Sequence, residues 1–319
     1  MPPEPNPVLS TLDGGIVQLT WSIPLGIPHV HCYLVPVEDG WLLVDTGLGV
    51  PGVEAAWAEA LASVDGPVAA ILVTHSHPDH VGAAADVARV TGAPVLQGRL
   101  DYARCVAHWG NEDAGAHLSD HLLRHGAPDL DAARIGEATR SLLPMVRFAR
   151  DPALLDEGDL VHGWRVLHLP GHADGHICLH RDGVLLAGDA ILDPITPTVG
   201  LFPGSSPDPL ADYFGSLARI GELRARVAYA GHGLPVADPT ERAEAIRAHH
   251  EVRLDETVRA LEGGPRSAWD VSLELFPEPL PPPQRRFAVV EALAHLEHLA
   301  RRGRLSAQAG DVVRYAIRT

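Results

Sequence analysis

The sequence predicts a mixed α/β (α+β) protein in which two β-sheets pack face to face and helices cover their outer faces. Strand-like and helical segments alternate up to residue 98, a pattern typical of layered α/β folds. A second strand-rich half begins near residue 158, and strands in both halves run into glycine beside histidine or aspartate. The chain has 319 residues, 46% of them apolar, so it can bury a large core.

The first half predicts strands wherever short β-branched runs are bounded by glycine or proline, namely at residues 15–21, 29–37, 40–47, 68–75 and 93–98. Apolar residues at helical spacing predict helices over residues 50–64 and 79–92. Residues 101–155 interrupt the alternation with polar, broken helical segments. We therefore expect a helical cap inserted over residues 101–155.

The second half returns to strands, which are predicted at residues 158–171, 176–181, 183–189 and 227–233. The sequence "RDG" at residues 181–183 is typical of a hairpin turn between two of them. Residues 208–226 have the amphipathic spacing of a helix that covers a sheet.

The character of the chain changes near residue 246, so we divide it into a main domain, residues 1–245, and a C-terminal module, residues 246–319. Helices are predicted over residues 244–264, 267–276 and 287–305, followed by a hairpin over residues 303–317. This order is typical of a winged-helix-like module. Between the last two helices, the proline-rich residues 278–286 predict a rigid link.

The composition indicates which binding partners and which cellular compartment to expect. The net charge is −16, and every basic residue is arginine, so sequence-independent nucleic-acid binding is disfavoured. Cys32, Cys105 and Cys178 are too few for a disulfide framework and suit a reducing compartment. The N-terminus lacks a secretory signal pattern, and no run reaches the roughly 20 apolar residues that span a bilayer. We expect a cytoplasmic protein without a membrane partner.

The segment "THSHPDH", residues 74–80, carries the strongest chemical signal. A histidine-rich solvated turn is one interpretation, but the spacing His-x-His-x-Asp-His is a metal-ligand signature. The segment lies where a predicted strand ends and a helix begins. There, His75 and His77 can point toward one metal ion, and Asp79 and His80 toward a second ion beside it.

Two metal ions need more ligands than these four residues supply. Three residues farther along the chain each follow an apolar run and sit beside glycine: His172, Asp189 and His232. Any one of them alone would be interpreted as structural. Together with the first segment, they predict a full set of metal ligands, which comprises His75, His77, Asp79, His80, His172, Asp189 and His232.

Such a set predicts hydrolytic chemistry. Two divalent ions that share Asp189 and a bridging water lower the pKa of that water to about 7, which gives hydroxide at neutral pH. Asp79 is predicted to be catalytic as well as a ligand, because its carboxylate can orient this hydroxide. The second ion polarises the substrate oxygen. Zinc is expected, and iron or manganese also suits mixed histidine and carboxylate ligands.

Other polar residues are predicted to support the site or to lie outside it. Asp45 ends a predicted strand and either accepts a hydrogen bond from a ligand histidine or caps a turn. His176 is expected beside the site in a supporting role. His249 and His250 are expected to be solvated on the polar helix. No substrate-binding residue is identifiable from the sequence.

Five segments, "LVDTG", "THSHPDH", "LPGHADGH", "LLAGD" and "AGHG", occur in an order that resembles the metallo-β-lactamase-fold hydrolase superfamily over roughly residues 15–245. The resemblance implies an αββα sandwich with the site at one sheet edge, in residues 1–245 as the catalytic domain. It also implies two metal sites bridged by Asp189, the first with His75, His77 and His172, the second with Asp79, His80 and His232.

The motifs also distinguish between branches of this superfamily. True β-lactamases of this fold lack a bridging aspartate at the position of Asp189, and flavo-diiron enzymes carry glutamate at the position of His77. Persulfide dioxygenases share many motifs but use a single iron, and the extra motifs of β-CASP nucleases are not recognisable. The C-terminal region is similar in architecture to the β-lactamase-like protein 2 family, whose characterised animal members are ribonucleases, and to glyoxalase II-like hydrolases.

Two enzymatic functions remain at this point. The first is hydrolysis of a small ester, either a thioester of the acyl-glutathione or acyl-CoA type or a lactone, which suits the acidic body. The alternative is a phosphodiesterase or single-strand endoribonuclease with the same two-metal site. A non-catalytic DNA-binding role is disfavoured because structural zinc sites usually use cysteine. The C-terminal module is expected to cover the site or to mediate a homodimer.

Overall fold

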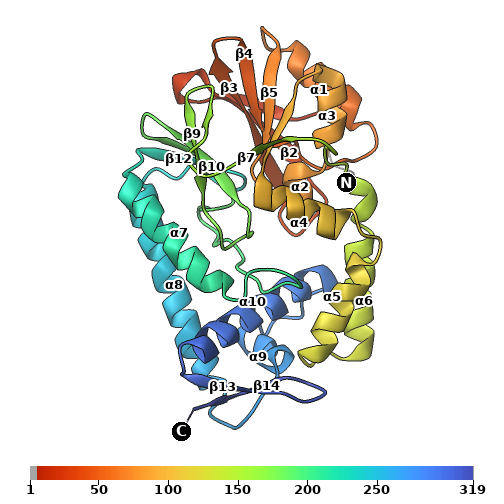
Figure 1. Ribbon diagram of the computed structural model, residues 1–319, viewed down its shortest axis with the longest axis vertical. Coiled ribbons are helices and arrows are strands. Elements are labelled where there is room, and N and C mark those ends of the chain that lie inside the picture. The colour runs from red at the N-terminus through yellow and green to blue at the C-terminus, as the bar shows by residue number, and fades with distance from the viewer. Residues whose placement is uncertain (1–5, 319) are drawn as a thin grey trace.

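The computed structural model describes residues 6–318 and confirms the predicted mixed fold. Two sheets form the upper part of the molecule in Figure 1, and a helical layer lies below them. Within residues 6–318 the first sheet has seven strands, which are β1 (Val8–Thr11), β2 (Val17–Ser22), β3 (His29–Val37), β4 (Gly40–Val44), β5 (Val68–Val73), β6 (Val95–Gly98) and β7 (Ala153–Leu155).

The first sheet is antiparallel from β1 to β4 and parallel from β4 to β7. Parallel neighbours need crossover connections, and helices α1 (Val53–Ala62) and α3 (Ala84–Thr91) lie in two of them. A short helix, α2 (Pro78–Val81), directly follows the histidine-rich segment after β5. The carboxyl ends of the parallel strands therefore meet at one edge of the sheet.

The second sheet follows the order β12-β11-β10-β9-β8 in the described part of the chain. Its strands are β8 (Leu160–Val161), β9 (Trp164–His168), β10 (Ile177–Arg181), β11 (Val184–Gly188) and β12 (Val227–Ala230). Asp182 and Gly183 have φ of 51° and 77°, as the predicted hairpin turn requires. Helix α7 (Pro209–Leu223) connects β11 to its parallel neighbour β12.

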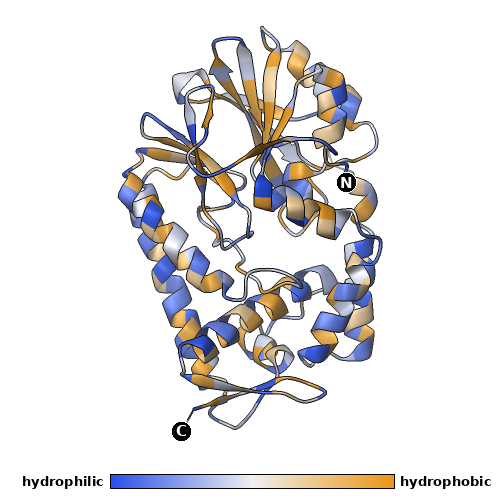
Figure 2. Ribbon diagram, in the orientation of Figure 1, coloured by the Kyte–Doolittle hydropathy of each residue, from blue (hydrophilic) through white to orange (hydrophobic). Residues whose placement is uncertain are grey.

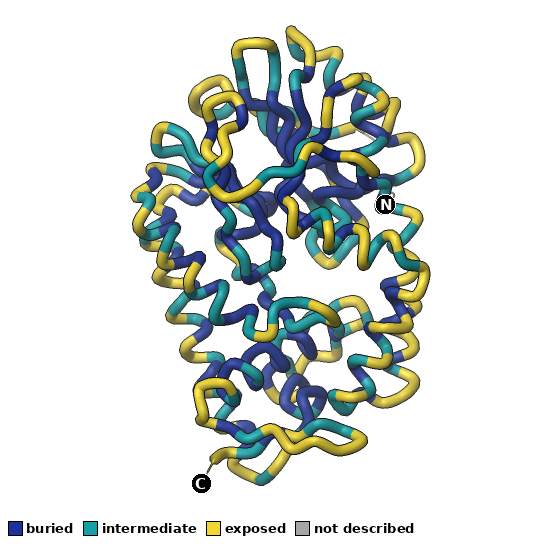
Figure 3. The backbone as a smooth tube through the Cα atoms, in the orientation of Figure 1, coloured by how far each residue is buried: buried dark blue, intermediate teal, exposed yellow. Residues whose placement is uncertain are grey.

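The packing follows from the twofold alternation of side chains along a strand. Leu42 and Val44 of β4 lie in the core between the two sheets, together with Trp164 of β9. Leu43, between them, belongs to the outer core with Trp57 of α1. Figure 2 shows apolar residues concentrated along the strands, and Figure 3 shows the same strands buried. The arrangement is a helix–sheet–sheet–helix sandwich.

Most of the remaining elements form the lower layer in Figure 1, whereas α4 (Arg99–Trp109) lies beside α2 and packs on the first sheet. The insertion contributes α4, α5 (Ala114–Arg124) and α6 (Asp129–Arg140), and the rest are α8 (Pro239–Arg259), α9 (Ala268–Leu275), α10 (Pro282–Arg301), β13 (Leu305–Gln308) and β14 (Arg314–Ile317). Leu118 and Leu122 of α5 share a core cluster with Trp269 of α9 and Val289 of α10. The insertion therefore packs on the C-terminal module, and the predicted boundary at residue 245 falls inside α8.

Three element predictions were wrong. The strand predicted over residues 158–171 is divided into β8 and β9 by a turn at His162 and Gly163, both of which have positive φ. The helix predicted over residues 79–92 is divided into α2 and α3, because Ala83 N donates to Gly47 O and Gly82 O accepts from Arg147 N instead of continuing the helical ladder. The proline-rich link is partly helical, since α10 begins at Pro282. Proline is well suited to the first turn of a helix, where its missing N–H costs nothing.

None of the helices within residues 6–318 combines the length and the apolar content that crossing a bilayer requires.

Candidate metal centre

The structure brings all seven predicted ligands to one edge of the sandwich. His75, His77, Asp79 and His80 follow β5 of the first sheet, whereas His172, Asp189 and His232 follow β9, β11 and β12 of the second sheet. Parallel pairing of β11 with β12 sets Gly188 beside Ala230, so the residues after these strand ends emerge together. The site is thus built jointly by the two sheets.

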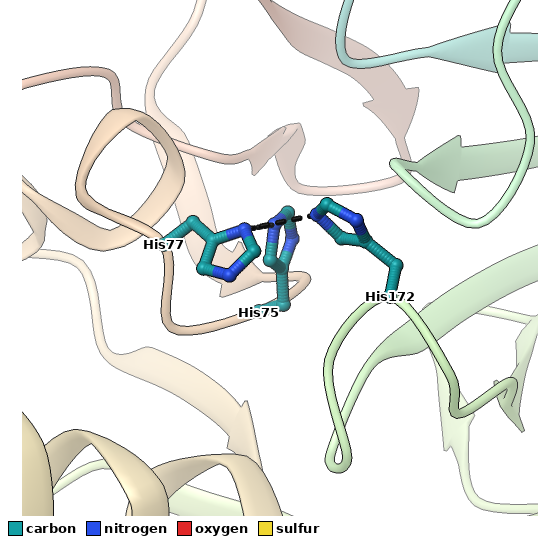
Figure 4. Close-up of side chains that lie close together, drawn as sticks. All are labelled: His75, His77 and His172. Carbon is teal, nitrogen blue, oxygen red and sulfur yellow. Dashed lines mark hydrogen bonds between the residues drawn. The ribbon is translucent and has the colours of Figure 1, made fainter. Parts of the chain in front are cut away.

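The first group consists of His75, His77 and His172, which converge in Figure 4. His77 Nδ1 lies 3.0 Å from His75 Nε2 and 2.9 Å from His172 Nε2. The outer ring nitrogens are occupied: His172 Nδ1 donates to Thr198 O at 2.8 Å, and His75 Nδ1 lies 3.0 Å from Thr74 Oγ1. Thr74 Oγ1 donates its own hydrogen to Asp45, so it accepts from His75.

These contacts fix the tautomers and show what the group can bind. His75 and His172 carry their hydrogens on Nδ1, so both Nε2 lone pairs face His77 Nδ1. A proton on His77 Nδ1 can be donated to only one of these two Nε2 lone pairs, whereas a metal ion can bind all three nitrogens. Ligand nitrogens of a tetrahedral zinc site lie about 3.3 Å apart, close to the spacing observed. Burial lowers the pKa of all three histidines, which keeps them neutral, as metal ligands must be.

The second group consists of Asp79, His80 and His232. His232 Nδ1 donates to His29 O at 2.6 Å, which turns its Nε2 toward Asp79 Oδ2, 3.4 Å away. His80 Nδ1 donates to Asp45 Oδ2 at 2.8 Å. The buried His80 Nε2 has no hydrogen-bond partner among the described residues. A buried ring nitrogen without a hydrogen-bond partner is unfavourable unless a cation, either a proton or a metal ion, occupies the position that it faces.

Asp189 lies between the two groups. Its Oδ2 is 3.5 Å from His172 Nε2 and 3.3 Å from His232 Nε2. Its buried Oδ1, 3.5 Å from His80 Nε2, accepts no hydrogen bond from residues 6–318. Gly231 permits this approach, because a Cβ there would lie 2.4 Å from Asp189 Oδ1. The carboxylate is therefore placed to contact cations in both groups.

The electrostatics of the second group favour cations. Burial of the two rings lowers the pKa of His80 and of His232, but Asp189 outweighs burial. It raises the pKa of His80 well above its usual value and that of His232 to about 10. Burial likewise opposes ionisation of Asp79, yet the hydrogen bond from His232 holds its pKa at about 2. Without metal, protons thus occupy His80 and His232 at neutral pH. A metal ion replaces these protons, so the donor set fits divalent ions.

Both predicted supporting residues lie against the site. Asp45 accepts from Thr74 N at 2.8 Å as well as from His80, so the structure favours the first of the two roles predicted for it. His176 Nε2 accepts from Asp189 N at 3.0 Å, and its ring stacks on that of His75 with centroids 4.7 Å apart. Asp45 orients one proposed ligand and His176 another.

Sequence reasoning missed two residues that hold the histidine-rich segment from α4. Asp101 accepts from Ser76 N at 2.9 Å, and Trp109 Nε1 donates to Ser76 O at 2.6 Å. Burial raises the pKa of Asp101 to about 7. Asp101 could have been predicted from the sequence, because it lies in a helix that directly follows β6. The ligands themselves were predicted because they follow strands.

One histidine prediction was wrong. His250 is not solvated but buried between α8 and α10, where its Nδ1 lies 3.2 Å from His295 Nε2. Glu291 completes a third cluster of possible metal-binding groups there. The polar composition of α8 concealed its inward face, because histidine was counted as a surface residue.

Comparison with known proteins agrees with this geometry. The family model described as "Metallo-beta-lactamase superfamily" matches residues 25–232, and the model "Metallo-beta-lactamase-like, C-terminal domain" matches residues 254–318. The probable metallo-hydrolase YqjP of Bacillus subtilis is 26% identical over 277 residues, covering 82% of this chain and 85% of that protein. An atrochrysone carboxyl ACP thioesterase of Aspergillus fumigatus is 23% identical, covering 73% of this chain and 45% of that protein.

Solved structures show the same architecture along nearly the whole chain. A metallo-beta-lactamase family protein of Thermus thermophilus, TTHA1429, is 39% identical with a TM-score of 0.83, covering 95% of this chain and 99% of that one. A beta-lactamase domain protein of Burkholderia ambifaria is 29% identical with a TM-score of 0.88, covering 97% and 94% respectively. The likeness includes the C-terminal module as well as the sandwich.

Proposed function

Because the chain belongs to the metallo-β-lactamase superfamily and is a metallo-hydrolase, we propose that it hydrolyses a small ester, either a thioester of the acyl-glutathione or acyl-CoA type or a lactone. The position of Asp189 between two groups of histidine and carboxylate donors carries the proposal, since it is the arrangement that a two-metal hydrolase needs. The fungal relative named as a thioesterase supports the substrate class.

The proposed centre holds two divalent ions, with zinc as the first candidate and iron or manganese as the others. The first ion is assigned to His75, His77 and His172, the second to Asp79, His80 and His232, with Asp189 shared. When bound, such ions activate water at neutral pH and polarise the substrate oxygen.

The chain's own residues prepare the attack. Asp79 is ionised at neutral pH, so its carboxylate can accept a hydrogen bond from the attacking water and orient it. Asp45 and His176 fix the ligand positions through His80 and Asp189. Asp101 and Trp109 hold the loop at Ser76, which lies between the first two histidines.

A small-molecule substrate also suits the charge of the protein. The net charge of −16 opposes the sequence-independent attraction on which nucleic-acid binding depends. We therefore place the phosphodiesterase or single-strand endoribonuclease activity second. A homodimer and a cytoplasmic location remain part of the proposal.

The test is turnover of a panel by the metal-loaded protein: a glutathione thioester, an acyl-CoA, a lactone, bis-nitrophenyl phosphate and a short RNA. The thioesters or the lactone should be hydrolysed. His77→Ala should abolish that turnover and lower the metal content measured by mass spectrometry. His117→Ala removes an exposed histidine of α5 and should change neither. Hydrolysis of the phosphodiesters alone would overturn the ester proposal and favour the nuclease alternative.

A further inference from the structure

The N-terminal half of α10 contacts segments that surround the metal centre. A Cβ on Gly26 would lie 3.2 Å from Gln284 Nε2, so this half of α10 touches the loop between β2 and β3. Farther along α10, Val290 O accepts from Leu201 N at 3.0 Å. The same loop contains Thr198, the acceptor for His172. The C-terminal module therefore reaches the side of the sandwich at which the proposed ligands lie.

Arg286 lies between these two contacts and has no carboxylate partner within residues 6–318. Its Nη1 donates to Thr139 Oγ1 of α6 at 3.2 Å, and its guanidinium lies 4.4 Å from the Phe287 ring centroid. Its Nε is shielded from water and has no acceptor among the described residues. A partly buried guanidinium without an anionic partner is unfavourable for the fold alone, and such violations of packing rules concentrate at functional sites.

Neighbouring groups leave this charge uncompensated. Burial lowers the pKa of Arg286 to about 10, so it stays protonated at neutral pH, and Asp79 of the metal centre is the acid whose charge opposes that shift. Burial and the charge of Arg286 lower the pKa of His108 to about 4, so that ring is neutral. Once a cation neutralises Asp79, no other carboxylate of residues 6–318 opposes the effect of burial on Arg286. Gln284 Oε1, two residues away, is also buried without a donor in the described chain.

We propose that Arg286 forms an anion-binding subsite beside the metal centre, which takes a carboxylate or phosphate group of the substrate. This assignment rests on the proposed ester hydrolysis and narrows it to esters with an anionic group. A guanidinium suits the role because its planar donors match carboxylate and phosphate oxygens. Nη1 is fixed by Thr139, so the side chain is already oriented, and Nη2, which donates no hydrogen bond within residues 6–318, is left to bind the anion. In a chain of net charge −16, such a local cation is what allows an anionic substrate to dock.

The test compares thioesters that share one acyl group and differ in the thiol: 3-mercaptopropionate, a mercaptoethyl phosphate and neutral N-acetylcysteamine. Wild type should prefer one or both anionic probes, mainly through KM. Arg286→Gln should lower kcat/KM for the preferred anionic probe about 10- to 100-fold, as expected for a hydrogen-bonded charge, and change the neutral probe less than about twofold. Arg286→Lys should restore part of the loss. The two anionic probes distinguish carboxylate from phosphate.

Arg302→Gln is the matched control, because it removes an exposed arginine at the other end of α10. It should leave all three probes unchanged. Equal losses on charged and neutral probes in Arg286→Gln would show that Arg286 is structural, and equal wild-type rates on all three would also overturn the subsite.

A binding measurement separates this proposal from the ester proposal. If neither the thioesters nor the lactone is hydrolysed, the proposed function fails, but calorimetric titration of the metal-loaded protein with benzoate and with inorganic phosphate still tests the subsite. At least one of these anions should bind wild type more tightly than Arg286→Gln. Identical affinities for both anions would overturn the subsite whatever the enzyme hydrolyses.

Discussion

Asp45 shows how one residue outside the proposed ligand set controls the site. Its backbone has φ of 61°, a left-handed conformation, and its carboxylate accepts from both Thr74 and His80. Asp45→Asn keeps the shape and tolerates this backbone, but it exchanges a charged acceptor for a neutral amide. We expect metal affinity to fall about 10- to 100-fold, as measured by competition with a chelating dye.

Asp182→Asn provides the matched control for that change. Asp182 also has a left-handed φ, 51°, but it is exposed in the β10–β11 turn. The Asp182→Asn variant should bind metal with the affinity of wild type. An unchanged affinity in Asp45→Asn would mean that His80 needs no anionic partner to act as a ligand.

At this scale, the sequence could predict the residues that occupy strand ends. His172, Asp189 and His232 each follow an apolar run beside glycine, and the structure brings all three to the histidine-rich segment. Arg286 could not be found in the same way, because its proposed role depends on where α10 packs against the loops of the sandwich. His250 was misplaced for a related reason, since its burial depends on a helix that follows more than 30 residues later.

At the scale of elements, we expect the contact between α8 and α10 to make stability depend on pH. Burial raises the pKa of Glu291 on α10 to about 7. The neighbouring His250 and His295 have pKa values of about 2 and 4, because burial disfavours their charged forms. Since the folded state holds the Glu291 proton up to about pH 7 and the unfolded state releases it near its model value of 4.5, stability should fall as pH rises through this window and level off above it.

Glu291→Gln should remove this contribution, which is on the order of 2–3 kcal/mol. The free energy of unfolding of wild type and variant is measured in urea at pH 5 and pH 8. The stability of the variant relative to wild type should be higher at pH 8 than at pH 5. Glu244→Gln, on the exposed face of α8, should show the wild-type pH dependence. Parallel pH profiles for Glu291→Gln and wild type would indicate that the carboxyl is ionised in the fold.

Element boundaries were predictable where local chemistry decides them. The β10–β11 hairpin follows from its Asp-Gly turn, and the strands follow from apolar runs bounded by glycine or proline. The break between α2 and α3 was not predictable, because Gly82 and Ala83 bond to Arg147 and Gly47, which come from other parts of the chain. The start of α10 at Pro282 was within reach, since proline favours the first turn of a helix.

At the scale of the whole molecule, bound metal ions should join the two sheets. His75 and His77 follow a strand of the first sheet, whereas His172 and Asp189 follow strands of the second. Ions that bind only the folded state stabilise it by about 4 kcal/mol when free metal is about 1,000 times the dissociation constant. Chelation should therefore lower the Tm reversibly, with recovery when metal is returned. His77→Ala should respond less, and an equal response would show that His77 holds no metal.

The late position of α10 in the chain has a consequence for biosynthesis. Leu293 and Leu296 of α10 belong to the same hydrophobic core as Leu185 and Ala187 of β11. While the ribosome is still translating the C-terminal region, that outer surface of the second sheet has only part of its cover. Until α10 has been translated, a nascent chain therefore exposes apolar surface that chaperones can bind. The arginine that we propose to select the substrate is part of the same helix. Translation of α10 therefore supplies both the missing cover of the second sheet and the proposed anion subsite.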